Sequence, residues 1–190
     1  MTFINLRGTS GSGKTTLIRE IMEHHQHVSD IFIEGRKRPI YSVYEKGNGE
    51  GCFAIMGHYE TACGGCDTIN KLDTVFEQAR IALRNAHVST VIAEGLLLGK
   101  DVSRIVTMEN PHVVYVDTPI EECYEGVRNR RLNKYISEGK EPDMEKVNKQ
   151  PKALANDHKS ILSAVNRLRD KVTVHEVSRE SGLRTILKLI

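Results

Sequence analysis

The most informative absence in the sequence is that of a long apolar run, because no stretch approaches the ~20 residues of a membrane-spanning helix. Residues 2–6 run directly into a glycine-rich loop, so we expect no signal peptide. An excess of charge of one sign is also missing: the formal net charge is +2, and no long basic tail indicates nucleic-acid binding. These absences argue against a membrane protein and predict a cytoplasmic one.

The chain also lacks internal repeats and a linker that would divide it. Its 190 residues suffice for one domain with a sizeable core and are too few for two ordinary domains. We therefore expect a single domain over residues 1–190. Four cysteines are present, and in a reducing compartment they should be thiols or metal ligands rather than structural disulfides.

Short apolar segments alternate with segments of helical periodicity. Strands are expected at residues 2–7, 28–33, 88–93, 112–116 and 172–175, and helices at residues 15–25, 68–85, 101–108, 119–136, 142–169 and from 178 onward. Segments 40–45 and 51–56 flank Gly47-Asn48-Gly49, which predicts a β-hairpin inserted into this pattern. Most strands are apolar throughout, which predicts an α/β three-layer sandwich: a mostly parallel sheet covered by helices on both faces.

One motif follows the first expected strand. Gly8-Thr9-Ser10-Gly11-Ser12-Gly13-Lys14-Thr15 matches the P-loop pattern G-x-x-x-x-G-K-[ST] at every fixed position, with a helix expected after it. The glycines let backbone N–H groups turn toward phosphate oxygens. We expect Lys14 to reach the β- and γ-phosphates of ATP and the Thr15 hydroxyl to ligate Mg²⁺, with Thr16 ending the nucleotide-binding stretch.

A P-loop alone does not separate kinases from other NTPases, but no guanine-reading N-K-x-D-like sequence is present. Residues 113–119, followed by Arg128-Asn129-Arg130-Arg131, resemble small P-loop nucleoside and nucleotide kinases. In that family an arginine-bearing lid closes over the triphosphate, which implies a lid at about residues 126–150. Arg128 and Arg131 share a helix face, so we expect them to be the lid arginines, whereas Arg130 should point elsewhere. A solvated basic helix face is the alternative.

A kinase also needs carboxylates to orient the acceptor hydroxyl and to hold Mg²⁺. Ligands of open α/β sheets lie at the carboxyl ends of the strands, where Glu34, Glu94 and Asp117 are expected. Glu94 is the first choice for the metal or for base catalysis, because its strand should neighbour the P-loop strand. Asp117 could instead cap the turn before Pro119, and Thr118 is expected to cap the helix that follows.

The glycine-rich stretch Gly57-His58-Tyr59-Glu60-Thr61-Ala62-Cys63-Gly64-Gly65-Cys66-Asp67 can wrap closely around a ligand. Glu60 and Asp67 are further candidates for the base. Cys52, His58, Cys63 and Cys66 could together bind zinc, although we favour a substrate loop with free thiols.

Together with the P-loop, Ala93-Glu94-Gly95-Leu96 and Asp117-Thr118-Pro119, this stretch looks like a group of P-loop kinases encoded by tailed bacteriophages. The resemblance extends to about residue 135. Some members are 5-hydroxymethyluracil DNA kinases, which phosphorylate the hydroxymethyl group of the modified base in phage DNA. The resemblance implies ATP, Mg²⁺ and a modified DNA as partners, and the host cytoplasm as the location.

A base inside a duplex would have to flip out to reach a kinase cleft. Arg36, Lys37, Arg38 and Lys46 could then grip backbone phosphates, and Tyr41, Tyr44, Phe53 and Tyr59 could stack on the base, although tyrosines along a hairpin also pack on the sheet. Two other functions remain open. One is a free nucleoside or nucleotide kinase, and the other is a non-catalytic ATP-binding regulator.

Overall fold

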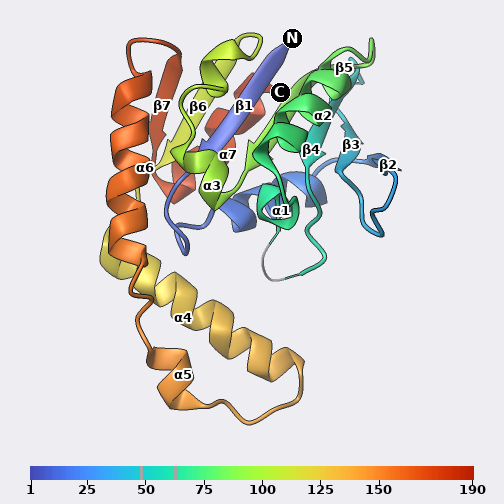
Figure 1. The fold of residues 1–190 in the computed structure, drawn as a ribbon. Helices are drawn as coiled ribbons and strands as arrows, with labels where there is room; N and C mark the ends of the chain where they lie inside the picture. Colours follow the sequence, from blue (N-terminus) through green and yellow to red (C-terminus); the bar gives the residue numbers. More distant parts are fainter. Residues whose placement is uncertain (48, 62–63) are drawn as a thin grey trace.

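The computed structural model describes residues 1–47, 49–61 and 64–190. These residues form a seven-stranded sheet with the order β2-β3-β4-β5-β1-β6-β7 (Figure 1). The strands are β1 (Thr2–Arg7), β2 (His27–Ile31), β3 (Tyr41–Glu45), β4 (Cys52–Met56), β5 (Val88–Glu94), β6 (Pro111–Val116) and β7 (Thr173–Val177). Strands β4, β5, β1, β6 and β7 pair in parallel, and β3 is antiparallel to both β2 and β4. The prediction of an α/β fold with a mostly parallel sheet is confirmed.

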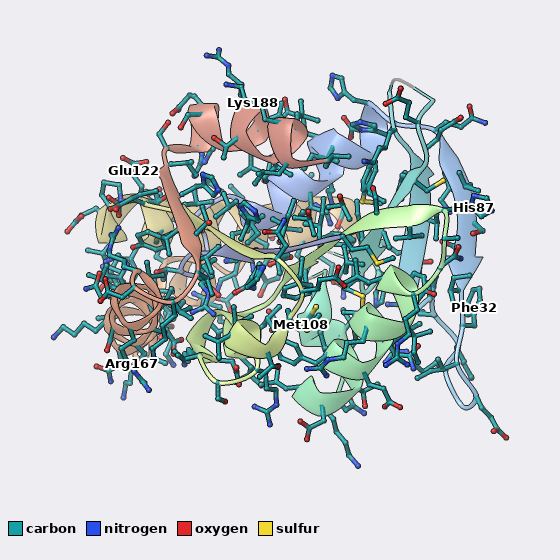
Figure 2. All side chains as sticks on the ribbon, turned by 90° about the horizontal axis from the view of Figure 1, so that it is seen from above. Phe32, His87, Met108, Glu122, Arg167 and Lys188 are labelled. Atoms are coloured by element: carbon teal, nitrogen blue, oxygen red, sulfur yellow. The ribbon has the colours of Figure 1, made fainter. Side chains whose placement is uncertain are left out.

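Helices lie on both faces of this sheet. They are α1 (Lys14–Glu23), α2 (Leu72–Leu83), α3 (Leu96–Lys100), α4 (Ile120–Ser137), α5 (Met144–Asn148), α6 (Leu154–Leu168) and α7 (Arg179–Leu189), with 3-10 turns at Cys66–Thr68 and Ile105–Thr107. Seen from above, Lys188 of α7 lies on one side of the sheet and Arg167 of α6 on the other (Figure 2). In the described part of the chain, none of these helices has the length and apolar character needed to cross a membrane.

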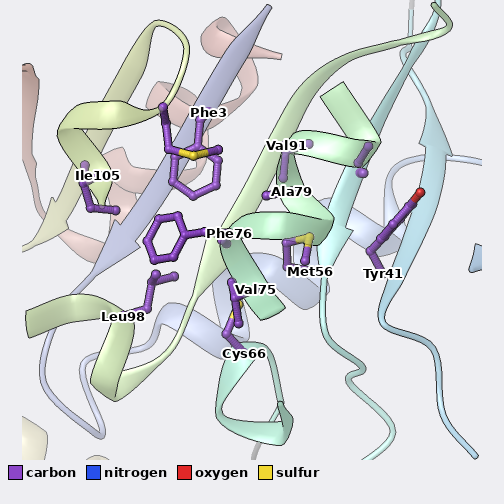
Figure 3. Close-up of a cluster of buried hydrophobic side chains, with 14 of the residues drawn as sticks. Phe3, Tyr41, Met56, Cys66, Val75, Phe76, Ala79, Val91, Leu98 and Ile105 are labelled. Atoms are coloured by element: carbon purple, nitrogen blue, oxygen red, sulfur yellow. The ribbon is translucent and has the colours of Figure 1, made fainter. Parts of the chain in front are cut away.

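The core is divided by the sheet into two main clusters. On one face Phe76 of α2 and Leu98 of α3 pack with Phe3 and Val91 (Figure 3). On the other face Ile18 of α1 packs with residues of the same strands that point the opposite way. Side chains alternate across each strand, so the apolar strand sequences fill both clusters.

Strand β1 is central and sets the position of the P-loop. It pairs with β5 so that Leu6 lies opposite Glu94, and with β6 so that Arg7 lies opposite Tyr115. Arg7 is fully buried, and it donates hydrogen bonds to Asn5 Oδ1 at 2.5 Å and to the carbonyl oxygen of Gly99 at 2.9 Å. These contacts fix the end of β1 from which the P-loop departs.

Several expected boundaries were wrong. The segment 101–108, expected to be a helix, contains only the 3-10 turn Ile105–Thr107, and the short helix α3 ends before it at Lys100. The helix expected at 142–169 is split into α5 and α6 around Pro151, because proline lacks the N–H that a helix interior needs. Thr118 does not cap α4, because its hydroxyl donates to the carbonyl oxygen of Ser12 at 3.3 Å. The 68–85 helix starts only at Leu72.

We call residues 120–149 the arm. Figure 1 shows that α4 leads away from the sheet and that α5 lies beside α4. Cys123 is the buried residue that α4 contributes among the described residues, so most of this helix stays outside the core. The arm is therefore a charged extension rather than a core layer.

Candidate active site

The P-loop between β1 and α1 uses backbone conformations that suit glycine. Gly11 and Gly13 have φ of 89° and 97°. A Cβ on Gly11 would lie 2.1 Å from the carbonyl oxygen of Cys123 in α4. Ser12 Oγ is buried and lacks a hydrogen-bond partner among the described residues. The loop opens onto the N-terminus of α1, where free backbone N–H groups and the helix dipole favour an anion.

Lys14 lies inside this loop. Its Nζ donates to the carbonyl oxygens of Gly8 at 2.7 Å and Thr9 at 3.1 Å, and the residue is 7% exposed. Burial lowers the pKa of Lys14, while the charges of Glu94 and Asp67 act in the opposite sense. A cation held in this way can interact with a phosphate without first shedding a water shell.

Glu94 ends β5 next to the P-loop, as its strand position predicted. Thr15 Oγ1 donates to Glu94 Oε1 at 3.1 Å. Glu94 is 3% exposed, and burial raises its pKa despite the nearby charge of Lys14. A hydroxyl and a carboxylate at one point supply the oxygen donors that Mg²⁺ prefers, so Thr15 and Glu94 could hold that cation.

Gly65 and Asp67, from the loop that follows β4, lie close to Glu94. His58 and Gly65 form an isolated antiparallel bridge, and a Cβ on Gly65 would lie 2.7 Å from Glu94 Oε1. Asp67 Oδ1 accepts a hydrogen bond from the backbone N–H of Leu96 at 2.8 Å, at the start of α3. The charge of Asp67 adds to the rise in the pKa of Glu94. Two carboxylates therefore lie side by side at the P-loop.

A cleft of about 1110 Å³ opens in front of the P-loop. Thr16 and Arg19 line it from α1, Glu60 and Thr61 from the loop, and Arg130 from α4. Arg130 lowers the pKa of both Lys14 and Glu94, so its positive charge acts on the same centre. The cleft is at the upper end of the usual size for ligand sites, which leaves room for two substrates.

The arginines of α4 are arranged differently from the expectation. Arg128 donates to Asn148 Oδ1 at 2.8 Å, and Arg131 donates to the carbonyl oxygen of Lys146 at 3.1 Å. The two share a face as expected, but that face meets α5. Arg130 points away from that face, as expected, but it lines the cleft, and Arg131 lines the cleft as well.

The signal that could have identified Arg130 is a pair of small residues. Cys123, Gly126 and Arg130 are spaced by three and four, so they share one helix face. A Cβ on Gly126 would lie 2.3 Å from the carbonyl oxygen of Gly11, so α4 sits directly on the P-loop at this glycine. The face that carries the small residues is the face that contacts the P-loop.

The remaining carboxylates lie farther from Lys14. Glu60 is on the rim of the cleft, where its Oε2 lies 3.4 Å from Arg38 Nε. Glu34 is exposed and follows β2, and three strands separate β2 from β1. At the usual strand spacing this is roughly 19 Å, so the structure does not bring Glu34 to the P-loop. Asp117 accepts a hydrogen bond from Tyr115 Oη at 3.4 Å.

The hairpin side chains have partners of their own. Arg36 donates to the carbonyl oxygen of Thr68 at 3.3 Å, and Arg38 Nη1 lies 3.1 Å from His58 Nε2. The four expected stacking residues are all buried, and they are Tyr41, Tyr44, Phe53 and Tyr59. Tyr44 and Phe53 stack on each other with ring centroids 5.7 Å apart. These rings pack in the core rather than forming an exposed platform for a base.

The possible zinc set includes Cys63, which lies outside the described residues. In the part of the chain that the structure describes, no three histidine, cysteine or acidic side chains are grouped to hold a metal. Burial raises the pKa of the Cys66 thiol well above its usual value, which opposes formation of the thiolate that binds zinc.

The sequence matches phage proteins named 5-hmdU DNA kinase. It is 36% identical over 192 residues to the one from Pseudomonas phage PaMx11, covering 98% of this chain and 96% of the relative. It is 28% identical over 206 residues to the one from Pseudomonas phage M6, covering 100% and 98%. The relative from Delftia phage PhiW-14 is 29% identical over 146 residues, which is 68% of this chain and 52% of the relative.

No protein-family model matches the chain. The family assignment depends instead on whole-length similarity, since more than a third of the aligned positions are identical to the PaMx11 protein and nearly all of both chains is covered. The chain therefore belongs to the family of the 5-hmdU DNA kinases.

Proposed function

We propose that the chain transfers the γ-phosphoryl group of ATP to the hydroxymethyl group of 5-hydroxymethyluracil in phage DNA. Membership of a kinase family makes the chain a phosphotransferase that uses ATP. The observation that carries the proposal is the Thr15–Glu94 hydrogen bond beside the buried Lys14, at the head of a cleft large enough for two substrates. We assign the fold to the P-loop NTPases on the motif and on the strand order around β1.

The proposed roles at the phosphate site follow from contacts. Residues 8–16 bind the triphosphate through backbone N–H groups, and Lys14 exchanges its carbonyl partners for phosphate oxygens. Thr15 and Glu94 are the proposed ligands of Mg²⁺, which would neutralise charge on the phosphates when bound. Arg130 adds positive charge from the opposite wall of the cleft, so the residues near the base of the arm act as the predicted lid.

Asp67 is the proposed base. Glu94 is occupied by Thr15, whereas the Asp67 carboxylate is exposed and spends one oxygen on the N–H of Leu96. Its second oxygen can accept a hydrogen bond from the acceptor hydroxyl and orient it for attack on the γ-phosphorus. Burial of the neighbouring Glu94 keeps the two carboxylates in different environments, which suits them to different roles.

The proposal is tested with labelled ATP and a panel of acceptors. The panel holds a duplex with 5-hydroxymethyluracil, the same duplex with thymine, and free 5-hydroxymethyl-2′-deoxyuridine with its monophosphate. We expect label in the modified duplex alone. Transfer of label only to the free nucleoside or nucleotide would show that DNA is not the substrate. Binding of ATP without transfer of label to any acceptor would favour a non-catalytic regulator.

The base assignment has matched controls in the same chain. Asp67→Asn keeps the amide oxygen that accepts from Leu96 but cannot take a proton, so we expect kcat to fall about 10²-fold or more. Glu60→Gln and Glu34→Gln remove one carboxylate each, and we expect changes below about threefold. A larger loss in Glu60→Gln than in Asp67→Asn would transfer the role to Glu60.

A further inference from the structure

A second cavity, of about 500 Å³, lies between α4 and α5 of the arm. Five cations and one carboxylate line it, and they are Arg131, Lys134, Lys140, Lys146, Lys149 and Glu138. This is a local excess of four positive charges, whereas the whole chain carries +2. We call this cavity the basic groove. Positive charge is concentrated here in a protein that is otherwise close to neutral.

The basic groove is held in shape by contacts that do not use the side chains of its lysines. Arg131 donates to the carbonyl oxygens of Lys146 and Lys149 at the end of α5, and Arg128 donates to Asn148 Oδ1. The two Arg131 contacts satisfy backbone carbonyls that a helix C-terminus leaves open. Val147 is 1% exposed and packs beneath. The two helices are thereby fixed, and the lysine side chains are left to surround the opening.

The lysines that have a carboxylate partner share it or meet it at the exposed surface. Lys146 Nζ lies 2.9 Å from Asp143 Oδ2, and these side chains are 75% and 39% exposed. Lys140 and Lys134 share one carboxylate, with nitrogen–oxygen distances to Glu138 of 2.7 Å and 3.9 Å. Their side chains are 65% and 68% exposed, and exposed pairs contribute little. Lys149 is also exposed. An anion in the groove would relieve the repulsion among these like charges, so the groove favours a ligand with several negative charges.

The basic groove is continuous with the active-site cleft. Arg131, Lys134 and Glu138 line both cavities. A ligand whose reacting group lies near Lys14 and whose body extends outward along α4 would pass from one to the other. A nucleic-acid strand has this shape, with a charge at every nucleotide.

We infer that the basic groove binds the phosphodiester backbone of the DNA acceptor, outside the nucleotide that enters the cleft. The inference rests on the proposed DNA substrate and adds where that substrate is held. It also shifts the main DNA contact from the hairpin to the arm, because Arg36 and Arg38 are engaged with Thr68, His58 and Glu60. Groove contacts of this kind would give affinity without reading sequence.

The test is the salt dependence of DNA binding, measured by fluorescence anisotropy with a labelled unmodified duplex. The variant is Lys140→Ala/Lys149→Ala, which leaves the residues shared with the cleft untouched. We expect roughly tenfold weaker binding near 0.1 M salt and a log–log salt slope smaller by about two. The matched control is Lys171→Ala/Lys188→Ala, which removes the same charge far from the arm and should bind like wild type.

Two further measurements separate the possible failures. ATP affinity should be unchanged in the groove variant, and loss of ATP affinity with unchanged DNA binding would assign the groove to the nucleotide instead. If the groove variant shows the same salt slope of DNA binding as the control variant, the inference is overturned. It is also overturned if the wild-type protein does not bind DNA. Wild type that binds DNA through the groove but does not phosphorylate the modified duplex keeps the inference and overturns the proposed acceptor chemistry. Thermal melts of both variants show that folding is intact.

Discussion

The P-loop and the arm both carry cations that we propose to act on phosphate, but the two sets of cations lie in opposite environments. Lys14 is 7% exposed and is held by two backbone carbonyls. Lys140 and Lys146 of the arm are 65% and 75% exposed in their side chains and pair with neighbouring carboxylates on the surface. The Coulomb interaction of a buried cation with a nearby anion is strong because the surroundings have a low dielectric constant. Each exposed cation interacts only weakly with an anion, and salt screens that interaction further.

This difference separates chemistry from binding. Transition-state charge is stabilised best by groups that are already desolvated and in place, and Lys14 is buried and has only to exchange two carbonyl partners for phosphate oxygens. A long polyanion is held best by many weak contacts that tolerate different sequences. The comparison therefore predicts large effects on turnover at the P-loop and moderate, salt-dependent effects on DNA affinity in the arm.

The largest effect is expected from Lys14→Met, which keeps much of the side-chain volume and removes the charge. Because the γ-phosphoryl group would lose its buried cation, kcat should fall at least about 10³-fold. The measurement is single-turnover transfer at saturating ATP and saturating modified duplex, so that a change in DNA affinity does not enter the rate. Lys149→Ala is the matched control in the arm and should keep kcat within about threefold. Equal losses in the two variants would break the comparison.

Arg130 tests the boundary between the two regions, because it is an arm residue that lines the cleft. Arg130→Ala should lower kcat about 10²-fold through lost charge stabilisation. Arg128→Ala removes a similar side chain from the opposite face of the same helix and should leave kcat within about threefold. If Arg128→Ala were the more damaging of the two, the face assigned to the phosphate site would be wrong.

The sequence predicted the P-loop region well for a physical reason. The motif Gly8–Thr15 works through backbone geometry, so its glycines, its lysine and its place after a strand are all visible in the order of residues. The position of Glu94 beside the P-loop was also predicted, because the neighbouring strand in an α/β sheet ends at the same edge. Local rules and sheet topology were sufficient for both.

The arm was predicted poorly because its packing is decided by contacts distant in sequence. The spacing of Arg128 and Arg131 shows that they share a face but does not say whether that face meets the P-loop or α5. Pro151 marked the break between α5 and α6, but proline alone does not give the path of the chain. Likewise, nothing local in Glu34 indicated that its strand lies at the sheet edge.

Gly126 sharpens the comparison, because it is where the arm rests on the P-loop. Inside a helix, replacing glycine by alanine normally stabilises by up to about 1 kcal/mol. Here the new methyl group would lie 2.3 Å from the carbonyl oxygen of Gly11, which is backbone and cannot move aside cheaply. We therefore expect Gly126→Ala to destabilise the protein by about 1–3 kcal/mol. Chemical denaturation measures the sign, and a gain in stability would show that α4 is not seated on the loop.

A smaller effect is expected on the pH dependence of folding stability, because the carboxyl group of Glu94 is buried. Burial raises the pKa of Glu94 above its usual value of 4.5. The folded protein then keeps a proton that the unfolded chain has already released, so wild type loses stability as the pH rises from about 4.5 through the folded-state pKa. Glu94→Gln lacks this loss. In thermal melts without ATP and Mg²⁺, the Tm of Glu94→Gln should exceed that of wild type, and the difference should grow with pH and then level off. In activity assays, the turnover of this variant should fall far more than its affinity for ATP.

The arm provides the control for this effect. Lys140→Gln removes a charge that is exposed and paired only at the surface, so its Tm should follow the wild-type curve at every pH. If the Tm of Glu94→Gln also followed the wild-type Tm at every pH, the Glu94 carboxylate would be solvated in the folded protein. The contrast between a buried P-loop and an exposed arm would then be wrong for this residue. A Tm margin that grew as the pH fell would contradict the direction of the pKa shift itself, since only a lowered pKa gives that sign.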